Sequence, residues 1–112
     1  LLAHNTRFPE GRFSALAGFV EAGETIEAAV HREVWEEVGI EIQDLEYVGS
    51  QSWSFPHSLM MGFMATYTAG EIAVDGIEID EADWFTPDCL PDLPPKFSIA
   101  RQLVDMGLAR VG

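Results

Sequence analysis

Three glutamates that could bind a metal ion, Glu33, Glu36 and Glu37, lie within about one helical turn of each other. Residues 26–30 carry apolar side chains at i, i+3 and i+4, the pattern of an amphipathic helix that faces a core. The next positions on that apolar stripe are Glu33 and Glu37, with Glu36 one step to the side. At an effective dielectric of about 20 and a separation of roughly 5 Å, each ionised pair of carboxylates costs about 3 kcal/mol. A divalent cation would reverse that cost, and an all-oxygen site suits Mg²⁺ or Mn²⁺.

The alternative interpretation of the three glutamates is a solvated acidic face of the helix. That interpretation predicts carboxylates on the side opposite the apolar stripe, whereas Glu33 and Glu37 continue the stripe. The periodicity therefore favours a metal site over an acidic surface.

The helix that must position the glutamates is predicted over residues 24–38. Gly23 breaks the preceding segment, residues 24–25 suit a first helical turn, and Gly39 suits a C-terminal stop. Strands on both sides of this helix, and a second helix at the end of the chain, predict an α+β sandwich. The expected strands are residues 1–4, 13–17, 40–48, 59–68, 72–74 and 83–86, and the expected final helix covers residues 97–108 with Ser98 as its N-cap.

The composition predicts one folded domain. The chain has 112 residues, of which 47% are hydrophobic and 11% aromatic, and these fractions argue against disorder. No apolar run approaches about 18 residues and no cleavable signal peptide is visible, so we expect no membrane segment. The single cysteine, Cys89, cannot form an internal disulfide, which fits a cytoplasmic location.

The formal net charge of −13 excludes an electrostatic surface for nonspecific nucleic-acid binding. It would also repel a pyrophosphate substrate unless a metal neutralised the site. Because the numbering opens at Leu1 inside an apolar run and without an initiator Met, we expect a fragment whose upstream part is missing.

A second group of residues, Ser50–Ser58 with the sequence SQSWSFPHS, suits an aromatic ligand. Trp53 and Phe55 alternate and would share one face of an extended segment, and Pro56 favours that extended conformation. Flat rings between neutral hydrogen-bonding side chains, such as Gln51, suit a heterocycle better than a phosphate. The alternative is an aromatic pair in the core of a strand.

The spacing of the first group resembles the Nudix box at every fixed position. The match consists of Gly18, five residues, Glu24, seven residues and then Arg32–Ile40 with the sequence REVWEEVGI. The resemblance implies a Nudix domain over residues 1–112, with the box at 18–40 and an α/β/α sandwich around a mixed β-sheet. It also implies hydrolysis of a nucleoside diphosphate linked to another moiety. The implied metal-binding and catalytic carboxylates are Glu33, Glu36 and Glu37, oriented by a salt bridge between Arg32 and Glu24, while Gly18 lets the backbone pass close to the site.

The second group resembles the motif SQPWPFPxS of NADH pyrophosphatases of the Nudix family. Six of its eight specified positions match, and Ser52 and Ser54 replace prolines that would stiffen the segment. The resemblance covers essentially the whole chain and implies a homodimer, with NADH, NAD or the NAD cap of an RNA as substrate. It implies zinc only in a four-cysteine ribbon upstream of the chain. The further residues that it implies are Glu78 and the Ala17 carbonyl as metal ligands, and Phe19, Gln51, Trp53, Phe55, Pro56, Ser58 and Ala100 as substrate contacts.

The resulting hypothesis is a metal-dependent pyrophosphatase that cleaves NADH or NAD to nicotinamide mononucleotide and AMP, with Glu36 or Glu78 as the base. One alternative is a Nudix hydrolase that acts on ADP-ribose or a dinucleoside polyphosphate, and another is an inactive nucleotide-binding fragment. The histidines have no partner cysteines at metal spacing, so we interpret them as structural or surface residues; they are His4, His31 and His57.

Overall fold

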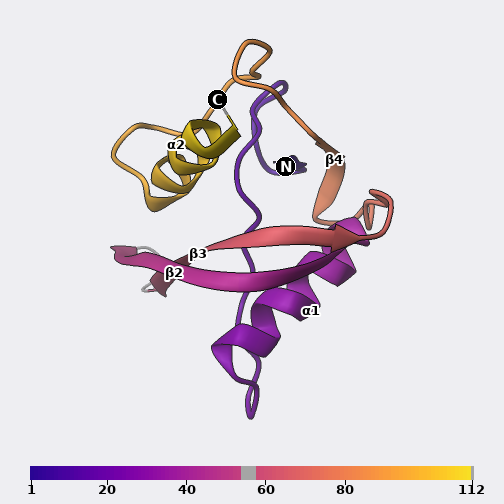
Figure 1. Cartoon of the computed structure of the whole chain (residues 1–112), viewed down its shortest axis with the longest axis vertical. Coiled ribbons are helices and arrows are strands. Elements are labelled where there is room, and N and C mark those ends of the chain that lie inside the picture. Colours follow the sequence, from indigo (N-terminus) through magenta and orange to yellow (C-terminus); the bar gives the residue numbers. More distant parts are fainter. Residues whose placement is uncertain (54–57, 112) are drawn as a thin grey trace.

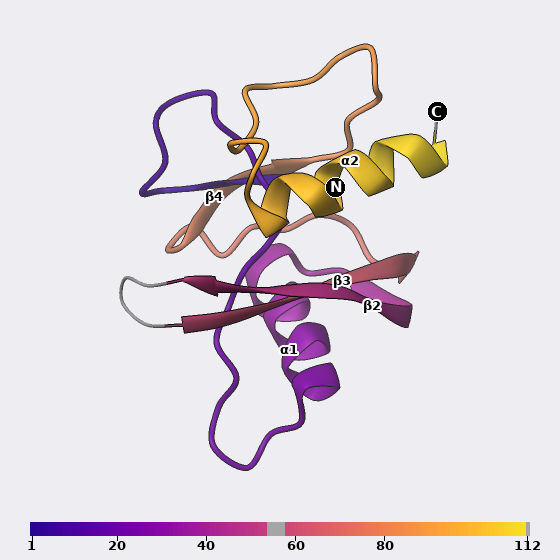
Figure 2. The ribbon, with the colours of Figure 1, turned by 90° about the vertical axis from the view of Figure 1, so that its left-hand side faces the viewer.

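The structure is a computed structural model that describes residues 1–53 and 58–111. Its central feature is a long antiparallel hairpin of two strands that lies between two helices (Figure 2). A second antiparallel pair joins the start of the chain to a strand near its end. The elements in chain order are β1 (Leu2–Asn5), α1 (Ile26–Val38), β2 (Glu41–Trp53), β3 (Ser58–Ala69), β4 (Ile79–Asp83) and α2 (Ile99–Val111), all but β1 labelled in Figure 1.

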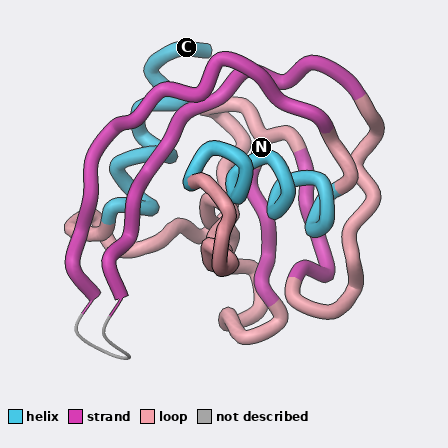
Figure 3. The backbone as a smooth tube through the Cα atoms, turned by 90° about the horizontal axis from the view of Figure 1, so that it is seen from below, coloured by secondary structure: helices cyan, strands magenta, loops and turns pink. Residues whose placement is uncertain are grey.

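The hairpin pairs β2 with β3 along most of its length (Figure 3), from Glu41 opposite Ala69 to Trp53 opposite Ser58. Its register shifts near Asp44, where the backbone adopts a φ of 53° and forms a bulge. Helix α1 packs against β2, and helix α2 packs against both strands of the hairpin. The α+β class that the sequence predicts is therefore confirmed.

Helix α1 begins and ends at residues with recognisable capping chemistry. The Thr25 hydroxyl accepts a hydrogen bond from the Ala28 N–H at 3.1 Å, so the helix begins two residues later than its sequence pattern predicts. Gly39 ends the helix in the left-handed conformation, with φ of 75°, and its N–H donates to the Trp35 carbonyl. The end of α1 is held by core packing, because Val38 is completely buried in a cluster with Ala3 and Ile79. This cluster brings α1 against the β1–β4 pair.

Three of the predicted strands are wrong in position or type. Residues 13–17 form no strand; Ser14 makes only an isolated bridge to Ala3, and the neighbouring Arg12 makes a parallel bridge to Asp92. Residues 72–74 lie beside the end of α1, where the Ala73 N–H donates to the Val38 carbonyl, and they belong to no strand. The last strand covers residues 79–83 instead of 83–86 because β1 pairs with that earlier segment. Each of these errors concerns a strand whose existence depends on a partner far away in the sequence.

Within residues 1–53 and 58–111, no helix combines the length and the apolar composition needed to cross a membrane.

Candidate active site

The candidate metal-binding glutamates of α1, Glu33, Glu36 and Glu37, differ in burial as their helical positions predict. Glu37 is 2% exposed, and its neighbour one turn earlier, Glu33, has a side chain that is 21% exposed. Glu36, one step to the side, has a side chain that is 57% exposed. The expectation that Glu33 and Glu37 continue the inward face of the helix is therefore confirmed.

The Arg32 guanidinium connects the glutamates to the loop before the helix. It binds Glu24 in a bidentate pair, with Nε to Oε2 at 2.7 Å and Nη2 to Oε1 at 2.9 Å. Its Nη1 donates to Glu33 at 2.8 Å and to Glu36 at 3.0 Å, and its Nη2 also donates to the Phe19 carbonyl at 3.0 Å. The hydrogen bonds from Arg32 are the largest cause of a lowered pKa at Glu24. A planar fork with five donors makes such shared bonding possible, and a lysine could not reproduce it.

Glu37 is the most perturbed carboxylate of the group. Both of its carboxylate oxygens are buried, and no hydrogen-bond donor in the described part of the chain reaches either of them. Burial, followed by the contact with the Glu78 carboxyl and the charge of Glu33, raises the pKa of Glu37 to about 8. The contact between Glu37 and Glu78 joins two acceptors, so it is a hydrogen bond only when one carboxyl carries a proton.

This arrangement fits a divalent cation in its donor chemistry. A buried carboxylate without a donor, beside a second carboxylate, offers the hard oxygen ligands that Mg²⁺ or Mn²⁺ requires. Among the residues that the structure describes, no three His, Cys, Asp or Glu side chains already converge into a site for a metal ion. Arg32 donates to Oε1 of Glu33 and to Oε2 of Glu36, so it uses one oxygen of each of these carboxylates.

A large cavity of about 1380 Å³ collects residues from distant parts of the chain. Apolar side chains of β3 and α2 form much of its wall, and the loop before α1 forms another part. The predicted site residues that line this cavity are Ala17, Gly18, Phe19, Glu33, Gln51, Ser58, Glu78 and Ala100. The side chain of Trp53 and the whole of Phe55 and Pro56 lie outside the described residues.

Gln51 has partners that the sequence pattern does not predict. Its side-chain N–H donates to the Phe97 carbonyl at 3.1 Å, and its side-chain oxygen accepts from the Ile99 N–H at 2.9 Å. The amide of Gln51 therefore ties β2 to the first turn of α2 and fixes the backbone next to Ala100. Ser98 caps this helix as predicted, since its hydroxyl accepts from the Arg101 N–H at 3.2 Å.

Two further side chains have roles that the sequence analysis missed or left general. Asp75 organises the loop that carries Glu78, and the Asp-Gly pair at residues 75–76 is a turn signal that could have identified it. His4 donates from its ring to Asp80 at 2.5 Å or shares a proton with it, and the hydrogen bond to Asp80 raises the pKa of His4. His4 is thus a structural residue between β1 and β4, in agreement with its interpretation from sequence.

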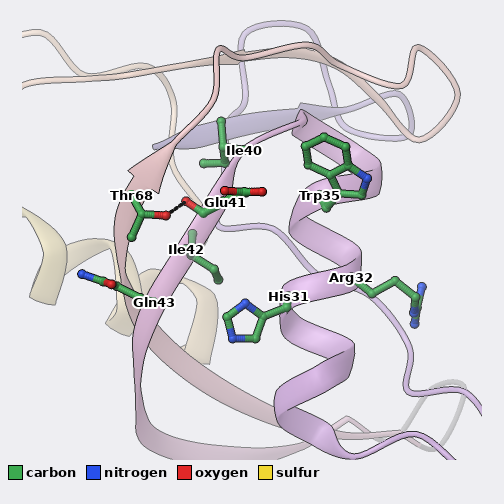
Figure 4. A pocket seen from close by; sticks show the side chains of 8 residues that line it. All are labelled: His31, Arg32, Trp35, Ile40, Glu41, Ile42, Gln43 and Thr68. Carbon is green, nitrogen blue, oxygen red and sulfur yellow. Dashed lines mark hydrogen bonds between the residues drawn. The ribbon is translucent and has the colours of Figure 1, made fainter.

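A smaller pocket of about 500 Å³ lies between α1 and β2, on another part of the surface (Figure 4). His31 and Trp35 face it from the helix, and residues 40–43 face it from the strand. The guanidinium of Arg32, although the residue contributes to the wall, points away from the other labelled side chains. None of Glu33, Glu36 and Glu37 lines this smaller pocket, whereas Glu33 lines the large cavity.

Gly18→Ala is expected to weaken Mn²⁺ binding by roughly tenfold, as the loss of a correctly oriented ligand does. A Cβ atom at Gly18 would lie 2.3 Å from Cδ of Glu33 and would push that carboxylate aside. Because the end of a glutamate side chain is flexible, the melting temperature should change little. Titration of Mn²⁺ followed by electron paramagnetic resonance measures the effect.

The matched control for this substitution is Gly49→Ala. A Cβ atom at Gly49 would meet only Cδ1 of Ile99, at the ordinary distance of 3.8 Å. It should leave Mn²⁺ binding unchanged. Wild-type Mn²⁺ affinity in Gly18→Ala would exclude Glu33 from the metal site.

Comparison with known proteins gives consistent similarities. The family model described as "NUDIX domain" matches residues 1–105 of this chain. The chain is similar to the "NAD-capped RNA hydrolase NudC" of Pseudomonas aeruginosa (strain LESB58), with 59% identity over 110 residues, which is 98% of this chain and 40% of that protein. Proteins of the same name from Chromobacterium violaceum and Pasteurella multocida are 52% and 56% identical over 99% and 94% of this chain, and over 42% and 40% of their own lengths. The chain thus spans about 40% of the length of these curated relatives.

Proposed function

The chain belongs to the Nudix family, and on this premise we propose that it hydrolyses the pyrophosphate bond of NADH or another NAD-type dinucleotide. The products would be nicotinamide mononucleotide, reduced when NADH is the substrate, and AMP. The observation that carries this proposal is the cavity of about 1380 Å³, whose wall combines Glu33 and Glu78 with Gly18 and Ala100. Small-ligand sites typically measure roughly 300–1,000 Å³, so this cavity has room for two ring systems joined by a diphosphate. Similarity to NAD-capped RNA hydrolases supports the choice of an NAD-type substrate.

The proposed cofactor is Mg²⁺ or Mn²⁺. When bound, such a cation supplies positive charge for the diphosphate, acidifies water and stabilises the leaving oxygen. The residues that would hold it are Glu33, Glu36, Glu37, Glu78 and the carbonyl of Ala17.

The side chains around these ligands have separate roles in the proposal. Arg32 orients Glu33 and Glu36, and Glu24 in turn fixes the guanidinium through its bidentate pair. Either Glu36 or Glu78 accepts the proton of the attacking water. Both are exposed, so either can pass this proton on to solvent.

The rings of the substrate are proposed to stack on aromatic side chains at the cavity. Phe19 is 75% exposed on the cavity wall, which suits a stacking role. Trp53, Phe55 and Pro56 would hold the nicotinamide end, with Ser58 as a hydrogen-bonding neighbour.

We further propose that an NAD-capped RNA would be recognised through its cap, since a net charge of −13 offers no general attraction for the RNA backbone.

The chain is proposed to act as a homodimer. Its accessible surface is 7281 Å², against about 6,100 Å² for a compact monomer of this mass, so a partner surface would cover part of the excess. Sedimentation velocity tests this state.

The proposed location is the cytoplasm, with the exposed free thiol of Cys89 as support.

The test of the function is cleavage of NADH in the presence of Mg²⁺ or Mn²⁺, with ADP-ribose as the competing substrate and chromatography of the products. NADH should yield reduced nicotinamide mononucleotide and AMP, and a chelator should abolish the reaction until Mn²⁺ is restored. Much faster cleavage of ADP-ribose would overturn the choice of substrate. Binding of both compounds without cleavage would instead indicate a nucleotide-binding fragment.

A further inference from the structure

The loop of residues 75–79, which carries Glu78, is organised from within by one carboxylate. Oδ1 of Asp75 accepts hydrogen bonds from the N–H of Ile77 at 3.1 Å and from the N–H of Ile79 at 3.0 Å. These two N–H groups belong to the residues on either side of Glu78. A charged acceptor makes stronger hydrogen bonds than a neutral one, so both neighbours of Glu78 are held firmly at one oxygen atom.

The backbone of Asp75 is bonded to the end of α1. Its N–H donates to the carbonyl of Glu37 at 3.0 Å, and the N–H of Ala73 donates to the carbonyl of Val38 at 2.8 Å. Asp75 therefore bonds to Glu37 through its main chain and to the neighbours of Glu78 through its side chain. One residue thus connects the end of the helix at Glu37 to the loop that carries Glu78.

The other side of the same loop is bound by Thr6, the residue that follows β1. The N–H of Thr6 donates to the Glu78 carbonyl at 2.9 Å, and the Thr6 hydroxyl donates to the Ile77 carbonyl at 3.3 Å. Ile79 is buried in the core cluster that also contains Val38. The loop thus has fixed supports on both sides, and Asp75 is the support that faces α1.

We propose that Asp75 is a positioning residue that holds the Glu78 carboxylate at its place beside Glu37, so that the two can share one metal ion. This inference rests on the proposed function, because it takes Glu78 to be a metal ligand. The negative charge of Asp75 by itself disfavours another negative charge nearby, and it contributes in this way to the raised pKa of Glu37. What Asp75 contributes is geometric: an acceptor on a short side chain that reaches two N–H groups of its own loop.

The experiment separates geometry from charge with two substitutions at Asp75. Asp75→Asn keeps an acceptor at the same distance from the backbone and removes the charge. Asp75→Glu keeps the charge and moves the acceptor away by one methylene. Asp75→Asn should bind Mn²⁺ with nearly wild-type affinity, whereas Asp75→Glu should bind it roughly tenfold more weakly, the size of losing the partner that orients a ligand.

Two further measurements distinguish positioning from a general structural role. Amide hydrogen exchange at Ile77 and Ile79 should accelerate in Asp75→Glu and remain slow in Asp75→Asn. In a double-mutant cycle, Asp75→Glu combined with Glu78→Gln should bind Mn²⁺ no more weakly than Glu78→Gln alone, because Asp75 acts through Glu78. The matched control is Asp88→Glu, the same change at an exposed loop carboxylate that accepts from Thr86, and it should leave Mn²⁺ affinity unchanged.

Several outcomes would overturn the inference. Wild-type affinity in Asp75→Glu, together with a weakened Glu78→Gln, would leave Glu78 a ligand and remove the role of Asp75. Equal losses in Asp75→Asn and Asp75→Glu would show that the charge of Asp75 and its position are both required, as for a direct ligand. Losses that multiply in the double variant would show that Asp75 acts independently of Glu78. Wild-type affinity in Glu78→Gln would remove both roles, while cleavage of NADH still tests the proposed function separately.

Discussion

Replacing Glu37 by glutamine is expected to lower metal affinity and turnover by roughly a hundredfold or more. The substitution keeps the volume of the side chain and removes one charge from a buried position that lacks any donor in the described residues. A loss of this size is typical when one preorganised electrostatic stabiliser is removed. Mn²⁺ titration and the rate of NADH cleavage at saturating metal measure the two effects.

The same substitution should leave the metal-free protein equally stable or make it more stable. The amide of glutamine can donate to Glu78, and above about pH 8 the substitution also removes the repulsion of ionised Glu37 by Glu33 and Glu78.

The pH dependence of metal-free stability has a definite sign. The pKa of Glu37 is about 8 in the folded chain and has an ordinary value of 4.5, so the folded state holds this proton more tightly than the unfolded state. The contribution of Glu37 to stability is therefore complete below about pH 4.5 and is lost as the pH rises through 8. Melting temperatures of the wild type between these pH values should fall more steeply than those of Glu37→Gln.

The matched control is Glu27→Gln, the same change at an exposed glutamate in the first turn of the same helix. It should preserve metal affinity, turnover and the pH dependence of melting. If Glu37→Gln keeps wild-type turnover at saturating Mg²⁺ or Mn²⁺, Glu37 has no part in the metal site.

Trp53→Ala is expected to lower kcat/KM for NADH by roughly ten- to a hundredfold, because stacking of a side chain on a base-like ring contributes about 1–3 kcal/mol. The loss should be smaller for ADP-ribose, which lacks the nicotinamide ring. Backbone pairing places Trp53 opposite Ser58 at the end of the hairpin, and Ser58 lines the large cavity. Chromatography of the products of both substrates, with wild type and variant, measures the difference.

Trp35→Ala is the matched control for that substitution. Trp35 is 58% exposed and faces the smaller pocket of Figure 4, so its loss should leave the cleavage of both substrates unchanged. If Trp53 served only as a core residue, both substrates would suffer equally and the melting temperature would fall by several degrees. That result would remove the ring-binding role and leave the hydrolase proposal to the carboxylates.

Local sequence determined the helix and the direction of its acidic residues. The 3.6-residue period places Glu37 and Glu33 on the inward face and Glu36 beside it, and this periodicity belongs to the backbone of a single helix. Thr25 begins the helix and Gly39 ends it, each through a hydrogen bond to a residue three or four positions away. Such contacts can be predicted from the sequence because every partner lies within one turn.

Tertiary structure alone decided which of these groups lack partners and which are shared. The sequence shows a glutamate at position 37, but only packing against β1 and β4 buries both of its oxygens beside Glu78. The motif around Gln51 predicts a polar contact, and its actual partners, Phe97 and Ile99, lie more than forty residues away. Strand positions follow the same rule: residues 79–83 form β4 because β1 pairs with them in a ladder, whereas residues 13–17 meet β1 only in the isolated bridge of Ser14 to Ala3. Whether a hydrogen-bonding group or a strand edge is paired depends on which partner the folded chain places opposite it. Periodicity along the sequence carries no information about that partner.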